Sequence, residues 1–150
     1  MKSAIAAIWE GVRKGNSPFG AAIVKNGKLV AVAHNTVLAS HDPSAHAEVN
    51  VLRAAAKKLG THDLKGCVVY STCEPCPMCF SAIHWANCDG IIYGAGIADA
   101  KKCGFRELEI SCARMKKLGK AKLFLVPGFM KKECAQAMNE WKKRKNRKTY

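Results

Sequence analysis

Two short segments of this chain place three metal-binding side chains at a fixed separation. They are His46-Ala47-Glu48 and Pro75-Cys76-Pro77-Met78-Cys79, about 30 residues apart. One imidazole and two thiolates form a ligand set that suits Zn²⁺, which prefers four ligands in a tetrahedron. Three protein ligands leave the fourth position open to water, whereas a structural zinc site fills it with another Cys or His. The set predicts one zinc ion per chain, and any fold that uses it has to bring the two segments together.

Other uses of these residues explain the pattern less well. A single Cys-x-x-Cys also occurs in redox proteins and in zinc ribbons. Cys73, Cys76 and Cys79 read as Cys-x-x-Cys-x-x-Cys, which is similar to an iron–sulfur run. The bacterial ferredoxin pattern needs a fourth cysteine four residues further on, and position 83 is isoleucine. The residue order therefore favours the zinc site, and we expect Cys73 at the end of a strand near it.

Glu48 lies two residues from the histidine ligand, which places a carboxylate beside the open metal position. Zinc lowers the pKa of a bound water toward about 7. A nearby carboxylate then takes the water proton and passes protons to a ring nitrogen and to departing ammonia. His-x-Glu followed by Pro-Cys-x-x-Cys is the signature of zinc-dependent nucleobase deaminases. We therefore predict an enzyme that replaces an amino group with an oxo group, with Glu48 as its catalytic proton shuttle.

Length and composition predict a single globular domain, residues 1–150, in the cytoplasm. The chain has 150 residues, of which 49% are hydrophobic. No apolar run reaches the ~18 residues that span a bilayer, and Ala4–Trp9 is too short for a secretory signal. Eight cysteines in such a chain indicate metal ligands and free thiols, not disulfides. We expect five of them to be buried apolar residues: Cys67, Cys88, Cys103, Cys112 and Cys134.

The formal net charge of +14 leaves two interpretations open. Lysine and arginine neutralise phosphates, so a polyanion such as tRNA is one candidate partner. A basic surface also serves solubility alone. We favour a solvated basic helix end over a nucleic-acid contact. Much of the excess charge lies at the C-terminus, in Lys142, Lys143, Arg144, Lys145, Arg147 and Lys148.

Hydrophobic periodicity and turn residues predict the element order α-β-β-α-β-α-β-α-β-α. Asn26-Gly27 indicates a hairpin, and Asp42-Pro43 indicates an N-cap and first helical residue, with Val49, Leu52 and Ala56 inward. This order predicts one mixed sheet covered on both faces. The expected helices are 3–14, 43–59, 77–87, two pieces within 98–117 divided at Gly104, and 131–145, and the expected strands are 21–24, 29–32, 67–72, 90–94 and 122–126.

Both ligand segments fall in the first turn of a predicted helix, where unpaired backbone N–H groups favour thiolates. The i, i+3 spacing of Cys76 and Cys79 points both sulfurs to one side. His46 and Glu48 do not fit this simple picture, because residues two apart in an ideal helix point to opposite sides. Their helix has to be approached end-on, or its first turn has to be distorted.

Over nearly its whole length the chain resembles the cytidine-deaminase-like superfamily, and within it the bacterial guanine deaminase branch. The segments that carry this resemblance are Ser17–Ala21, His41–Val49, Ser71–Cys79, Ala82–Ala86 and the terminal Tyr150. The resemblance implies an α/β fold of three layers, α/β/α, around a mixed five-stranded sheet. It also implies a homodimer, in this branch often with exchanged C-terminal segments.

The resemblance further implies which residues contact a substrate. Asn35 would hydrogen-bond the base, Phe19 and Trp85 would wall the pocket, Ala47 would lie against the substrate, and Tyr150 would close over the site. The segment Gly104-Phe105-Arg106-Glu107 departs from the branch, which usually has acidic residues directly after Gly-Phe. The sequence therefore assigns no acidic residue to the guanine edge.

Several substrates remain open at this stage. The first hypothesis is deamination of a small purine base or nucleoside, with guanine converted to xanthine and ammonia released. The second is a tRNA wobble-adenosine deaminase, which Asp99-Ala100-Lys101, the segment 128–134 and the basic charge favour. The third is a cytosine- or cytidine-type pyrimidine deaminase. A zinc-bearing nucleic-acid-binding protein without activity is a further class, and the presence of Glu48 argues against it, because a binding protein needs no carboxylate beside an open metal position.

Overall fold

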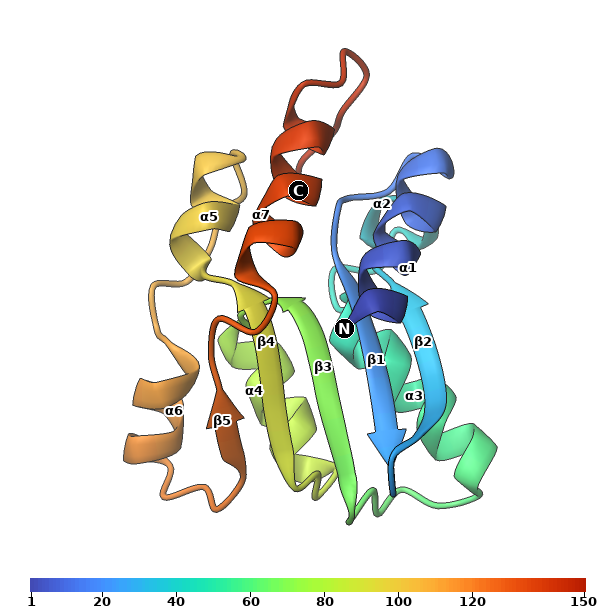
Figure 1. The fold of residues 1–150 in the computed structure, drawn as a ribbon, viewed down its shortest axis with the longest axis vertical. Coiled ribbons are helices and arrows are strands. Elements are labelled where there is room, and N and C mark those ends of the chain that lie inside the picture. Colours follow the sequence, from blue (N-terminus) through green and yellow to red (C-terminus); the bar gives the residue numbers. More distant parts are fainter.

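A computed structural model describes residues 1–150, and it contains one mixed five-stranded sheet with helices on both faces (Figure 1). This confirms the predicted fold class and the predicted order of the main elements. One short helix, α2, lies between the second predicted strand and the second predicted helix, where the sequence predicted neither a helix nor a strand. The elements are α1 (Lys2–Arg13), β1 (Gly20–Lys25), β2 (Lys28–His34), α2 (Val37–Ser40), α3 (Ala47–Leu59), β3 (Cys67–Cys73), α4 (Pro77–Trp85), β4 (Gly90–Ala95), α5 (Ile97–Lys102), α6 (Cys112–Leu118), β5 (Phe124–Val126) and α7 (Lys131–Lys142).

The strand order of the sheet is β2-β1-β3-β4-β5. β1 pairs antiparallel with β2 and with β3, whereas β3, β4 and β5 run parallel. The predicted hairpin is confirmed, since Asn26 and Gly27 have φ values of 50° and 72°. Positive φ at both central residues is what a two-residue hairpin turn requires. The parallel half of the sheet places the ends of β3 and β4 at the same edge.

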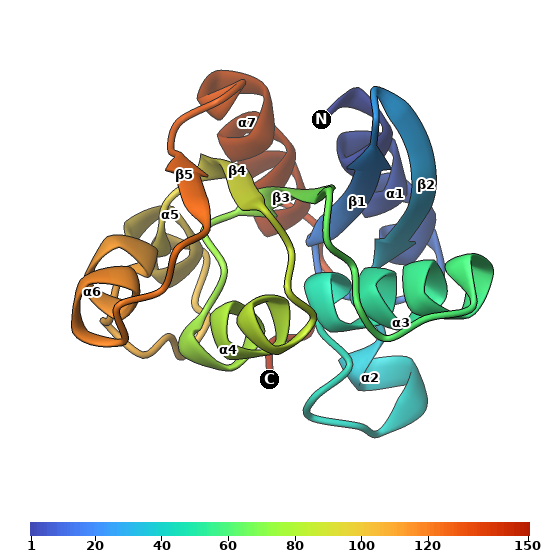
Figure 2. The same cartoon turned by 90° about the horizontal axis from the view of Figure 1, so that it is seen from below.

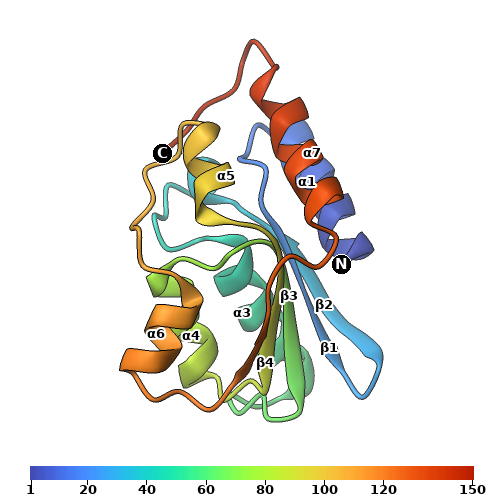
Figure 3. The same cartoon turned by 60° about the vertical axis from the view of Figure 1, so that its left-hand side comes forward.

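Helices cover the sheet in two separate layers. α1 and α7 pack on one face, and α3, α4 and α6 lie on the other (Figures 1 and 3). Two glycines permit close packing in the first layer, because a Cβ at Gly20 would collide with the backbone of α1 and a Cβ at Gly94 with Cys134 of α7. The five cysteines expected to be structural are all buried. None of the helices is both long and apolar enough to span a membrane.

Helix α3 begins four residues later than the sequence predicts. The Asp42 carboxylate accepts hydrogen bonds from the backbone and hydroxyl of Ser44, at 2.8 and 2.6 Å. This closes a turn, so Asp42 does not cap a helix, and Ala47 is the first helical residue. The inward face is also shifted: Leu52 is buried as predicted, but its buried neighbours are Val51 and Ala55. Hydrophobic periodicity predicts helix α3, whereas the turn that Asp42 forms with Ser44 determines the residue at which the helix begins.

Because α3 starts late, the ligand His46 lies immediately before its first turn. α3 and α4 lie beside each other on the same face of the sheet (Figure 2). α4 starts four residues after the end of β3, and α3 starts directly after His46. The beginnings of these two helices therefore approach each other at one end of the sheet.

Candidate active site

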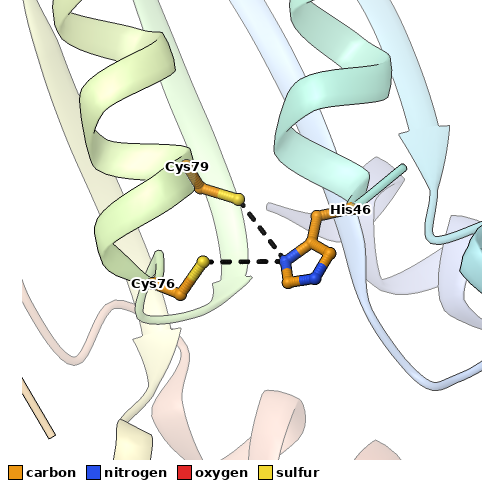
Figure 4. A group of neighbouring side chains, drawn as sticks. All are labelled: His46, Cys76 and Cys79. Atoms are coloured by element: carbon orange, nitrogen blue, oxygen red, sulfur yellow. Dashed lines mark hydrogen bonds between the residues drawn. The ribbon is translucent and has the colours of Figure 1, made fainter. Parts of the chain in front are cut away.

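His46, Cys76 and Cys79 converge between the starts of α3 and α4 (Figure 4). The His46 Nδ1 atom lies 3.7 Å from Cys76 Sγ and 3.5 Å from Cys79 Sγ, and the three ligand atoms lie within 4.8 Å of one another. Tetrahedral zinc with ordinary Zn–N and Zn–S bonds separates nitrogen and sulfur by about 3.6 Å. The three side chains are thus positioned to hold a zinc ion, as the sequence predicts.

The backbone at each helix start explains how His46 and Glu48 share one site. His46 is the N-cap of α3 and has an extended conformation, with φ −65° and ψ 157°. Glu48 is already in the first helical turn. Cys76 has the equivalent place in α4, as an N-cap with φ −64° and ψ 167°, and Cys79 follows within the first turn. Because one residue of each pair is extended and the other helical, both side chains reach the same point.

The two thiols differ in acidity. The pKa of Cys76 falls to about 4, because the neighbouring Cys79 thiol stabilises its thiolate and the His46 ring lies beside it. The pKa of Cys79 is raised, first by this contact with Cys76 and then by burial. Metal ligands are deprotonated, so zinc binding releases this remaining proton.

Glu48 lies beside the ligands in a buried position, with a side chain held from two directions. Ser71 Oγ donates to Glu48 Oε1 at 2.8 Å, and Cys79 Sγ donates to Glu48 Oε2 at 3.5 Å. Burial raises the pKa of Glu48, and the cation-forming ring of His46 opposes that shift. A carboxyl with a raised pKa binds and releases a proton closer to neutral pH than an exposed one.

A small cavity of about 20 Å³ opens onto these groups. This space holds about one water molecule. Three residues that the sequence assigned to the substrate line it, and so does Cys73, which ends β3 as expected. The complete lining is Phe19, Asn35, His46, Glu48, Cys73, Glu74, Cys76, Glu107 and Tyr150.

Asn35 and Tyr150 meet inside this cavity. Asn35 is fully buried, and its Oδ1 accepts a hydrogen bond from Val37 N at 3.1 Å. Its Nδ2 donates to Tyr150 Oη at 2.7 Å. The Tyr150 ring also lies 5.5 Å from the ring of His46 and 5.6 Å from that of Phe105. The last residue of the chain thus closes the site of its own chain.

The structure does not bring Trp85 to this cavity. Trp85 is the last residue of α4 and is 81% exposed. Trp85 lies six positions after Cys79 in α4, and this spacing places it about 9 Å further along the helix axis. The prediction that it walls the pocket is therefore wrong within one chain. Ala47 is fully buried at the start of α3 but does not line the cavity.

Glu107 lines the cavity, although the sequence assigned it no role. It lies in the segment between α5 and α6, which has no regular secondary structure. Burial raises its pKa, and the negative charge of Cys76 adds to the shift. The Gly-Phe motif was the available signal, but the acid lies one position later than in the branch that the sequence resembles.

Comparison with known proteins agrees with this geometry. Residues 1–95 match the cytidine and deoxycytidylate deaminase zinc-binding region. Guanine deaminase of Bacillus subtilis is 47% identical over 106 residues, which is 70% of this chain and 68% of that protein. The tRNA-specific adenosine deaminase of Aquifex aeolicus is 39% identical over 95 residues, or 63% of each chain.

Among solved structures, a mutant of NE0047 in complex with 8-azaguanine superposes with a TM-score of 0.87. It is 26% identical, and the match covers 94% of this chain and 81% of that one. The shared ligand segments, the fold and these relatives lead to one conclusion. This chain belongs to the cytidine and deoxycytidylate deaminase zinc-binding family and is a hydrolytic deaminase.

Proposed function

We propose that this protein hydrolyses guanine to xanthine and ammonia. The observation that carries the proposal is that Glu107 lines the same cavity as Glu48 and the metal ligands. An ionised carboxylate only accepts hydrogen bonds. In guanine, the N1–H and the amino group on C2 are adjacent donors, and C2 is the carbon that reacts. In adenine, the ring nitrogens nearest to the amino group are acceptors, so Glu107 suits guanine better.

His46, Cys76 and Cys79 would hold the zinc ion, and Glu48 would move the protons. When bound, zinc lowers the pKa of water toward about 7. Glu48 Oε1 is engaged by Ser71, which leaves Oε2, on the side of Cys79, to take the water proton. Glu48 then protonates a ring nitrogen beside C2 and finally the departing amine. The oxygen of water replaces the amino group, and one water is consumed for each ammonia released.

Asn35 and Phe19 would orient the base. Asn35 N donates to the Phe19 carbonyl at 3.0 Å, so the two residues are tied together. The Phe19 ring packs edge-on against Phe105 at 4.7 Å and gives the cavity one apolar wall. The buried amide of Asn35 supplies both a donor and an acceptor. The expected homodimer, with or without exchange of C-terminal segments, is part of this proposal.

Tyr150 would cover the bound base. The cavity beneath it is too small for a purine, so the ring has to move when substrate enters and then close over it. Deleting Tyr150 should raise the KM for guanine or lower kcat, without loss of zinc, because water then enters and a stacking surface is lost. Tyr150→Phe keeps the ring and removes only the bond to Asn35, so it should lie between wild type and deletion. Unchanged kinetics after removal of Thr149 and Tyr150 would exclude the lid role.

Glu107→Gln should lower kcat/KM for guanine by about 10- to 100-fold, since a hydrogen bond to a charged group contributes roughly 1.5–3 kcal/mol. The NH₂ group of the introduced glutamine can also face the N–H groups of guanine, and two donors do not form a hydrogen bond with each other. Zinc content should not change. Glu109→Gln is the matched control, because Glu109 is exposed on the same segment and pairs with Lys101. Equal effects of the two substitutions on guanine turnover would show that Glu107 does not contact the base.

A second candidate function is deamination of adenosine in tRNA. The basic residues of the C-terminal segment are exposed, and none of them takes part in a salt bridge. Such a surface binds phosphates with an affinity that falls by ~0.7–0.9 log units per log unit of salt for each phosphate neutralised. We favour the small base because Glu107 lies in the cavity, and we expect only weak, non-specific RNA binding.

One panel of substrates decides between the candidates. Ammonia release should be measured with guanine, guanosine, adenine, cytosine and a tRNA anticodon stem-loop at physiological salt. We expect guanine to have the highest kcat/KM and to respond little to ionic strength. Deamination of the stem-loop together with binding at micromolar concentration or below would overturn the guanine proposal.

A further inference from the structure

Glu74 connects the metal-ligand segment to two other parts of the fold. It follows β3 directly and precedes Pro75 and Cys76, and its backbone N–H donates to Ala95 O at 2.8 Å. Its side-chain Oε1 accepts hydrogen bonds from the backbone N–H of Cys112 at 2.9 Å and from Tyr93 Oη at 3.3 Å. One carboxylate thus joins the metal-ligand segment to β4 and to the start of α6.

A second contact strengthens the link to α6. Cys112 Sγ donates to the Pro75 carbonyl at 3.3 Å. Cys112 therefore contacts both Glu74 and Pro75, the two residues that come immediately before the ligand Cys76. The start of α6 cannot shift relative to the ligand segment without breaking one of these bonds.

The segment from Gly104 to Ser111 depends on this link, because it carries Glu107 and ends at α6. At its other end, Phe105 anchors the chain: it is buried and stacks on Trp141, with ring centroids 5.2 Å apart. Between the two anchors, Arg106 and residues 108–110 are exposed. Phe105 on one side and Glu74 on the other therefore hold the two ends of the segment that carries Glu107, and the exposed Glu109–Lys101 pair lies between them.

We propose that Glu74 is a positioning residue that holds the Glu107 segment at a fixed distance from the metal ligands, and so determines how tightly the base binds. The inference rests on the proposed role of Glu107. It requires only that Glu74 accepts two hydrogen bonds, which a glutamine Oε1 also does. Alanine removes both bonds, and aspartate is one methylene shorter, so it cannot reach both donors.

Kinetics of Glu74 variants test the proposal. Glu74→Ala should raise the KM for guanine at least 10-fold, with kcat within about 3-fold and zinc content unchanged. Glu74→Gln should restore a KM close to that of the wild type, and Glu74→Asp should lie between the two. If the alanine variant does not fold, the aspartate variant carries the test. Loss of zinc, or a lower kcat at unchanged KM, in the folded variants would overturn the proposal, because Glu74 would then act on the ligand segment alone.

A double-mutant cycle sharpens the result, because residues that act through each other give non-additive effects. Glu74→Ala combined with Glu107→Gln should bind guanine no more weakly than Glu107→Gln alone. If instead the two substitutions weaken guanine binding by factors that multiply in the double variant, Glu74 does not act through Glu107.

Limited trypsin cleavage gives a readout that does not depend on the substrate. Arg106 is exposed within the segment, so Glu74→Ala should speed cleavage there at least 5-fold, whereas Glu74→Gln should not. An unchanged cleavage rate in the alanine variant would overturn the anchoring role. If the wild type does not deaminate guanine, the proposed function fails, and the cleavage result still decides whether Glu74 holds the segment.

Discussion

Replacing Glu48 with glutamine should lower kcat by about 10²- to 10⁴-fold, the usual contribution of a general acid–base group, while the protein keeps its fold and its zinc. The amide has nearly the same size as the carboxylate and can still accept the hydrogen bond from Ser71 Oγ. It cannot take a proton from water or pass one to the leaving amine. Because Glu48 serves several proton transfers, the loss should fall in the upper part of that range, and Glu48→Ala should behave in the same way.

The measurement is ammonia release on the best substrate of the panel, with zinc content determined on the same sample. Glu10→Gln is a suitable control, because Glu10 is an exposed carboxylate on α1 that pairs with Lys14, and it should not change the rate. If either Glu48 variant keeps more than about a tenth of wild-type turnover with full zinc occupancy, Glu48 is not the proton shuttle.

The double variant Cys76→Ala/Cys79→Ala should lose both zinc and measurable turnover. One imidazole is all that remains of the ligand set, and a single neutral ligand cannot replace two thiolates. The fold should persist, because the large hydrophobic core is built from the sheet and the helices that cover it. Metal analysis should then fall from about one zinc per chain to background, while circular dichroism keeps its helical signal.

Cys73→Ala is the matched control for this variant. Cys73 also lines the cavity, but its sulfur contacts the Gly96 carbonyl at 3.7 Å and it is not part of the ligand cluster. It should therefore retain one zinc per chain. Stoichiometric zinc in the double variant, or loss of zinc in Cys73→Ala, would show that the ligand set has been assigned wrongly.

The sequence alone was sufficient to predict the order of the main helices and strands along the chain and the three metal ligands. Local patterns carry both kinds of information: alternation and 3.6-residue periodicity predict strands and helices, and Asn26-Gly27 predicts its turn. The ligand segments are equally local, because Cys-x-x-Cys at a helix start places two sulfurs on one side whatever the rest of the fold does. These predictions needed no knowledge of which segments meet.

Predictions that depended on the direction of a side chain, or on contacts that the sequence pattern does not show, were less successful. The sequence placed the start of α3 at Pro43, with Asp42 as the N-cap, because it could not show that the Asp42 carboxylate is used by Ser44. The resemblance to the guanine deaminase branch implied that Trp85 walls the pocket. The helix instead carries that side chain away from the cavity and into solvent.

By itself the sequence determined that this chain is an α/β protein with a three-ligand zinc site and a carboxylate beside it. The resemblance placed Phe19, Asn35 and Tyr150 at the substrate, but only the tertiary structure showed that Tyr150 contacts Asn35 directly and that Glu107 lines the same cavity. Glu107 lies in an irregular segment, so no periodic pattern indicates its direction, and Tyr150 reaches Asn35 across 115 positions of the chain. The physical reason is that periodicity fixes side-chain direction only within one helix or strand. The relative placement of separate segments is set by how the helices pack on the sheet and by single contacts such as that of Glu74 with Cys112.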